Sequence, residues 1–151
     1  MTNLLIIYHS QSDKTEHMAQ AVYTGAKQEA GINVLLKKAF AGTLDDLLWA
    51  NGIIFGTPEN FGYMSGALKD FFDRTYYPAE PYQINLPYGI FVSAGNDGTG
   101  AVREIDRIVL GYPLRKVAEP VIAKGELCAR DIERCSELGQ ALAAGLVMGI
   151  F

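Results

Sequence analysis

The stretch that decides the fold is Tyr8-His9-Ser10-Gln11-Ser12-Asp13-Lys14-Thr15-Glu16. It joins the apolar run at residues 4–7, which is typical of a buried strand, to a segment whose apolar residues recur at helical spacing. A loop between a strand and a helix directs several backbone N–H groups to one place, where the positive end of the helix dipole favours an anion. Three hydroxyl residues within positions 10–15 are more than a helix cap needs. We therefore predict a phosphate site at the start of this helix.

The composition is that of an ordinary globular chain, with 151 residues of which 49% are hydrophobic and 20% charged. We expect one domain over residues 1–151. No segment reaches the roughly 18 uncharged apolar residues of a membrane span, and the N-terminus lacks the basic region of a signal peptide, so we expect a cytoplasmic protein with no membrane partner. A net charge of −4 without a basic run argues against nucleic-acid binding. Cys128 and Cys135 are expected to be packed thiols, too far apart on one helix for a disulfide.

Strand-like and helix-like segments alternate along the whole chain, which is the pattern of an α/β parallel sheet covered by helices on both faces. The expected strands are 4–7, 32–37, 52–56, 88–93 and 116–123. The expected helices begin near Thr15, Thr43, Ser65, Ala101 and Cys128, and the third of them is expected to end near Tyr76. Polar residues alternate in the second strand, so we expect it at an edge of the sheet.

Ligands of such a sheet bind beyond the carboxyl ends of its strands. Three loops lie there: the first loop (residues 8–15), the second loop (57–64) and the third loop (93–100). The second loop carries Phe61 and Tyr63, and the third has three glycines, whose lack of a side chain lets backbone approach a flat ligand. Together the loops indicate a ligand with a phosphate and a planar ring.

These loops resemble those of a known family. Ser10 to Thr15 resembles the flavodoxin phosphate loop, whose pattern is [ST]-x-[ST]-G-x-T, with Asp13 in place of the glycine. Gly56 to Gly66 is similar to the ring-binding loop of flavodoxin-like NAD(P)H:quinone and FMN reductases, and Ser93 to Gly100 resembles their second ring loop. The resemblance covers nearly the whole chain and implies a three-layer flavodoxin-like fold, with a five-stranded parallel sheet in the order 2-1-3-4-5.

The resemblance also implies an FMN site. The residues implied at the FMN phosphate are Ser10, Gln11, Ser12, Asp13, Lys14 and Thr15. Those implied at the isoalloxazine ring are Thr57, Pro58, Glu59, Asn60, Phe61, Gly62, Tyr63 and Met64, with Ser93, Ala94, Gly95, Asn96 and Gly98 along its pyrimidine edge. Backbone N–H groups of the third loop would stabilise negative charge at the N1–O2 edge of the reduced ring. No catalytic side chain and no metal is expected, because N5 of FMN takes the hydride.

The implied activity is hydride transfer from NAD(P)H, as cosubstrate, through FMN to a quinone or similar flat acceptor, with a homodimer left open. The alternatives are a one-electron carrier of flavodoxin type and an interaction domain that has lost tight FMN binding through Asp13. Electron-carrier flavodoxins of the family that the loops resemble usually cover the ring with an aromatic residue of this loop and are commonly more acidic. The third loop here lacks an aromatic residue and the net charge is only −4, so the resemblance favours an enzyme over a carrier. No cysteine follows the first strand and no G-x-x-x-x-G-K-[ST] motif is present, which disfavours a low-molecular-weight phosphatase and a P-loop NTPase.

Four other residues have two interpretations each. His9 either reaches the phosphate or substrate, or is structural. Arg74, Tyr76 and Tyr77 border either the acceptor site or a dimer contact.

Overall fold

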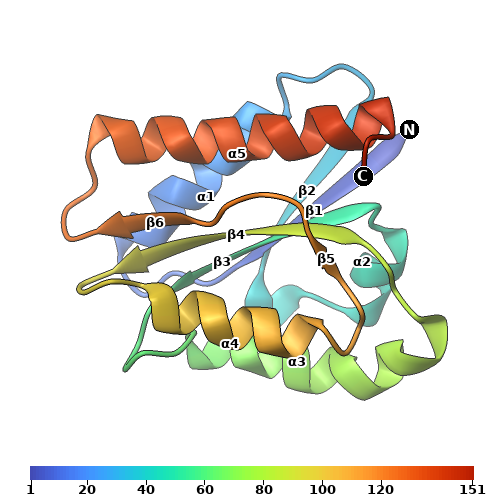
Figure 1. Cartoon of the computed structure of the whole chain (residues 1–151), viewed down its shortest axis with the longest axis horizontal. Coiled ribbons are helices and arrows are strands. Elements are labelled where there is room, and N and C mark those ends of the chain that lie inside the picture. The colour runs from blue at the N-terminus through green and yellow to red at the C-terminus, as the bar shows by residue number, and fades with distance from the viewer.

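The computed structural model describes residues 1–151 and has three layers, with one parallel sheet between two layers of helices. The strands are β1 (Thr2–Tyr8), β2 (Ile32–Lys38), β3 (Gly52–Pro58), β4 (Pro87–Ala94), β5 (Arg115–Lys116) and β6 (Val121–Lys124). The α-helices are α1 (Asp13–Ala26), α2 (Leu44–Trp49), α3 (Gly66–Ala79), α4 (Thr99–Val109) and α5 (Ala129–Met148), with short 3₁₀ helices η1 (Ala39–Ala41) and η2 (Glu80–Tyr82). Helices α1 and α5 cover one face, and α3 and α4 cover the other (Figure 1).

The strand order is β2-β1-β3-β4-β5, with β6 also paired to β4, and every pairing is parallel. This order and the edge position of β2 confirm the predictions. The fifth strand, predicted as one segment over 116–123, is instead the two short strands β5 and β6. Six residue steps from Arg115 to Val121 face four steps of β4 from Pro87 to Phe91, so the ladder breaks after Val117, whose amide still donates to the Tyr88 carbonyl at 3.1 Å. Pro120 has no N–H to donate to a ladder, which accounts for a break here.

The sheet is buried on both faces, as its nearly continuous apolar strands require. In β1 the side chains of Leu5 and Ile7 pack in the cluster beneath α3 and α4, whereas those of Leu4 and Ile6 pack beneath α1 and α5. Helices α1 and α5 approach closely, because a Cβ added at Gly139 would lie 2.0 Å from the Val22 carbonyl oxygen. None of the helices is long and apolar enough to cross a membrane.

Two local predictions were wrong. Helix α3 runs past Tyr76 to Ala79 and contains Pro78 in its last turn. Cys135 is buried as predicted, but Cys128 is exposed at the N-cap of α5, where its thiol contacts the Asp131 carboxylate. Both thiols are free.

Candidate functional site

The three predicted loops meet at the carboxyl edge of the sheet, on the left of Figure 1 and opposite both chain termini. Each pair of loops is tied by a hydrogen bond between side chains or between a side chain and an amide. The ties are Gln11 with Asn60, Glu59 with Gly98, and Thr15 with Ser93. Each loop is therefore hydrogen-bonded to both of the others. A movement of any one loop would break a hydrogen bond to each of the other two.

The first loop presents unpaired backbone donors. The amides of Gln11, Ser12, Asp13 and Thr15 donate to no acceptor within the chain. They lie at the N-terminus of the 14-residue helix α1, where unpaired N–H groups and the helix dipole favour an anion. This arrangement fits the predicted phosphate.

The hydroxyls of the first loop, which the sequence suggested as phosphate ligands, make hydrogen bonds within the chain. The Ser10 hydroxyl accepts from the Glu16 amide at 3.0 Å and donates to the Ser12 carbonyl, and the Ser12 side chain caps α1. The Thr15 hydroxyl is buried against Ser93 at 2.7 Å. The free donors for a phosphate are therefore the backbone amides and the Ser12 hydroxyl, which only accepts a bond within the chain.

Asp13 and Lys14 open helix α1. Asp13 is exposed and has helical backbone, since the only non-glycine residues at positive φ are Phe61 and Gln83. It therefore needs none of the left-handed tolerance that glycine or aspartate offers. The ammonium of Lys14 lies 3.6 Å from the carboxylate of Glu126, in the loop between β6 and α5. This fourth loop at the site was not predicted.

The second loop forms a small hairpin. The amides of Asn60 and Tyr63 donate to each other's carbonyls at 2.8 and 3.0 Å, with Phe61 and Gly62 at the turn at φ 53° and 74°. The Phe61 side chain is fully exposed, at 107% of its reference area. An exposed aromatic residue in left-handed backbone is uncommon and points to a function at the hairpin tip.

Two residues of the second loop that were predicted at the ring have buried side chains. The Met64 side chain is buried in the core cluster, so it has no surface to offer a ring. Thr57 is fully buried, and its hydroxyl donates to the Pro58 carbonyl and accepts from the Ser65 amide. Pro58, Asn60 and Tyr63 remain partly exposed.

The glycines of the third loop serve mainly the contact between loops. The Gly98 amide, predicted to face the ring, donates to the Glu59 carboxylate at 3.2 Å. A Cβ added at Gly100 would lie 2.2 Å from the Gly62 carbonyl oxygen, so this glycine admits the second loop rather than a ligand. Gly95 has no neighbour within 4 Å of an added Cβ, and it and Asn96 are exposed. The free part of the third loop is therefore its beginning.

His9 follows β1 beside the first loop. Its Nδ1 is buried without a hydrogen-bond partner, and its ring meets that of Phe40 edge-on at 6.2 Å. Burial lowers the pKa of His9 below its usual 6.5, because the imidazolium loses hydration. The structure thus favours a neutral, packed His9 over one that adds charge to a phosphate site.

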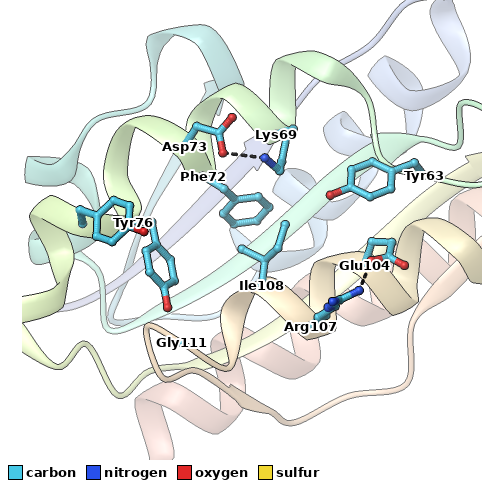
Figure 2. A pocket seen from close by; sticks show the side chains of 10 residues that line it. Tyr63, Lys69, Phe72, Asp73, Tyr76, Glu104, Arg107, Ile108 and Gly111 are labelled. Atoms are coloured by element: carbon cyan, nitrogen blue, oxygen red, sulfur yellow. Dashed lines mark hydrogen bonds and ion pairs between the residues drawn. The ribbon is translucent and has the colours of Figure 1, made fainter.

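A groove that the sequence did not reveal lies between α3 and α4 (Figure 2). It has a volume of about 610 Å³ and is lined by Tyr63, Lys69, Phe72, Asp73, Tyr76, Tyr77, Glu104, Arg107, Ile108 and Gly111. Tyr63 belongs to the second loop, so the groove begins at the edge of the three-loop site. The signal in the sequence was the spacing of Lys69, Phe72, Asp73 and Tyr76, which places them on one helix face.

The two walls of the groove carry ion pairs. On α3, the Lys69 ammonium lies 2.6 Å from the Asp73 carboxylate, and on α4 an Arg107 nitrogen lies 3.7 Å from Glu104 (Figure 2). Arg74 is not part of the groove. Its guanidinium donates to the carbonyls of residues 42 and 39 at 2.9 and 3.0 Å, which anchors η1 to α3.

The fold and the three-loop edge define a flavodoxin-like protein with a site suited to FMN. A family model described as NADPH-dependent FMN reductase matches residues 13–124, and the chain belongs to this family.

Two curated relatives match part of the chain. A flavodoxin of Aquifex aeolicus is 40% identical over 73 residues, which cover 48% of this chain and 40% of that protein. An NAD(P)H dehydrogenase (quinone) of Acidithiobacillus ferrooxidans is 37% identical over 95 residues, covering 50% of this chain and 48% of that protein. The matches span less than half the length of either relative.

Solved structures share the whole fold. An archaeal flavodoxin has a TM-score of 0.85 at 21% identity, with 97% of this chain and 99% of that chain covered. A flavodoxin, WrbA-like protein from Agrobacterium tumefaciens has a TM-score of 0.82 at 23% identity, with 98% and 99% covered. Rubredoxin oxygen:oxidoreductase from Desulfovibrio gigas has a TM-score of 0.83 at 19% identity, but only 37% of that chain is covered. At these identities the likeness concerns the fold alone.

Proposed function

We propose that the chain is a one-domain cytoplasmic oxidoreductase that transfers hydride from NAD(P)H through FMN to a quinone or a similar flat acceptor. The observation that carries the proposal is the set of three mutually bonded loops around the unpaired amides of α1. The phosphate and the ring would then lie along one edge of the sheet, between loops that are bonded to one another. Bonding of this kind favours catalysis, because the reacting ring is held in place before the donor arrives.

In this proposal the first loop would bind the phosphate of FMN, and the second and third loops would border its ring. The amides of residues 11–13 and 15 would hold the phosphate, while Lys14 at the same helix start adds a positive charge. Pro58, Asn60, Phe61 and Tyr63 of the second loop would border the ring, as would Gly95 and Asn96 of the third. When bound, FMN supplies the hydride chemistry at N5, and the protein supplies orientation and electrostatics.

The third loop supports an enzyme over a carrier. From Ala94 to Gly100 it contains no aromatic side chain, and its exposed start at Gly95 has open space around it. A ring bordered on that side only by small residues would keep one face accessible to nicotinamide and then to the acceptor. The quinone dehydrogenase relative and the name of the family support the same assignment.

The test is stopped-flow mixing of the anaerobic FMN-loaded protein with NADH and, separately, with NADPH. We expect the flavin absorbance to bleach with at least one donor and to recover when a benzoquinone is added. The reductase proposal is wrong if, with both donors, protein-bound FMN is reduced no faster than free FMN.

The second candidate is a flavodoxin-type electron carrier. It is favoured by the exposed Phe61, an aromatic side chain free to cover one ring face, and by the flavodoxin relative. A redox titration separates the two functions. A carrier should take up its two electrons in two resolved steps, whereas the proposed reductase should show a single two-electron step.

A further inference from the structure

Glu59 joins the second loop to the third through two sets of contacts. Its carboxylate accepts from the amides of Gly98, Gly100 and Ala101 at 3.2, 3.1 and 3.4 Å. Its own amide donates to the Ser93 carbonyl at 2.8 Å. A single residue of the second loop thus holds both ends of the third loop.

The carboxylate lies at the N-terminus of α4, where free amides would otherwise favour an external anion. Here the anion comes from the protein itself. The amides at positions 98, 100 and 101 are therefore already engaged and are unavailable to a ligand. Of the donors expected along the third loop, only those at its start remain for a ring edge.

Capping of α4 alone does not account for this contact. The first turn already has a local acidic acceptor, since the Asp97 carboxylate accepts from the Thr99 amide at 2.9 Å and from its hydroxyl at 2.8 Å. Glu59 reaches the helix from about 40 residues away in the sequence. Its contact therefore fixes the relative position of two loops, which a local cap does not.

We propose that Glu59 is a positioning residue that clamps the third loop against the second and biases the site toward oxidised FMN. The clamp stands on the contacts above, and the bias rests on the proposed function. Reduction adds negative charge to the N1–O2 edge of the ring, which is expected beside the third loop. A fixed carboxylate there disfavours that charge and cancels part of the favourable field of the α4 dipole.

The experiment compares Glu59→Gln, Glu59→Ala and a control, Glu119→Gln, with the wild-type chain. Glu119 is an exposed acid between β5 and β6, so its replacement changes net charge by the same amount outside the site. The first readout is amide hydrogen exchange at Gly98 and Gly100 in the FMN-free protein. The second is the ratio of the dissociation constants for oxidised and reduced FMN, obtained from the two-electron midpoint potential.

We expect the two amides to exchange at least about tenfold faster in Glu59→Ala. In Glu59→Gln we expect reduced FMN to gain about tenfold in affinity relative to oxidised FMN, which equals a rise of about 30 mV for a two-electron couple. The control should match wild type in both readouts.

Unchanged exchange at both amides in Glu59→Ala would overturn the clamp, and an unchanged affinity ratio in Glu59→Gln would overturn the bias. Exchange is measured without FMN, so it decides the clamp even if the proposed function fails. Failure of wild type to bind FMN would refute the proposed function and, with it, the bias.

Discussion

The hydroxyl of Thr15 lies 2.7 Å from the hydroxyl of Ser93, so a buried hydrogen bond joins the first turn of α1 to the end of β4. The two side chains are only 1% and 7% exposed, and 78 positions separate them in the sequence. This bond connects the part of the site that would hold a phosphate with the part that would border a ring.

Replacing Thr15 with valine keeps the shape of the side chain but leaves the Ser93 hydroxyl without its partner. We expect the free energy of unfolding to fall by about 1–3 kcal/mol, the usual cost of an unsatisfied buried polar group. Ser93→Ala should cost a similar amount, because it leaves the equally buried Thr15 hydroxyl without its partner. In the double variant the decrease in the free energy of unfolding, measured by urea denaturation, should be smaller than the sum of the decreases in the two single variants. Full additivity would mean that the two hydroxyls do not interact.

Asp13→Gly should leave FMN affinity equal or make it tighter, because it removes a carboxylate from the predicted phosphate position. The same change should lower the free energy of unfolding by up to about 1 kcal/mol, since glycine is a poor helix former and an acid in the first turn is favourable. Fluorescence titration with FMN and thermal unfolding measure the two effects. Asp13→Asn removes the charge without the added backbone freedom, and clearly weaker FMN binding in both variants would contradict the position assigned to the phosphate.

The sequence predicted the elements that local patterns determine. The apolar run of β1, the helical spacing in α3 and the glycine-rich third loop each depend on neighbouring residues, and each lies where it was expected. The break in the fifth strand depends on how many residues of β4 lie opposite it, which a strand pattern does not encode.

The site was predicted at the level of loops but not of contacts. Glu59 was expected at the ring, yet its carboxylate accepts from amides about 40 positions away in the sequence. Residues so far apart in the sequence come together only when the sheet has folded. Thr15 matches the phosphate pattern in sequence, but its hydroxyl turns to Ser93. The α3–α4 groove needed both helices in place before Lys69 and Glu104 could face the same space.

Gly100→Ala should separate the second and third loops, because the added Cβ would meet the Gly62 carbonyl at 2.2 Å. We expect FMN affinity to fall at least about tenfold, corresponding to about 1.4 kcal/mol, while the circular dichroism spectrum stays that of wild type. Gly66→Ala is the matched control, since a Cβ there has no neighbour within 4 Å. Equal FMN affinity in the two variants would show that contact between these loops is not needed for binding.

His9 should make the protein less stable in acid. Its folded pKa is lowered from 6.5 by burial, so the unfolded chain binds the proton more tightly. The stability that His9 contributes is complete above about pH 6.5, declines as the pH falls from there toward the folded pKa, and then levels off. Urea denaturation at several pH values should give His9→Gln a shallower loss below about pH 6.5, and identical slopes for the two proteins would contradict the neutral, packed state of this imidazole.

The central claim is that three bonded loops at one edge of the sheet form an FMN site. Titration of the FMN-free protein into FMN, followed by flavin fluorescence, tests it most directly. We predict a saturable change in fluorescence at one FMN per chain, weakened in Gly100→Ala and retained in Gly66→Ala. A wild-type protein that leaves FMN fluorescence unchanged would contradict the claim and would favour an interaction domain with a flavodoxin-like fold.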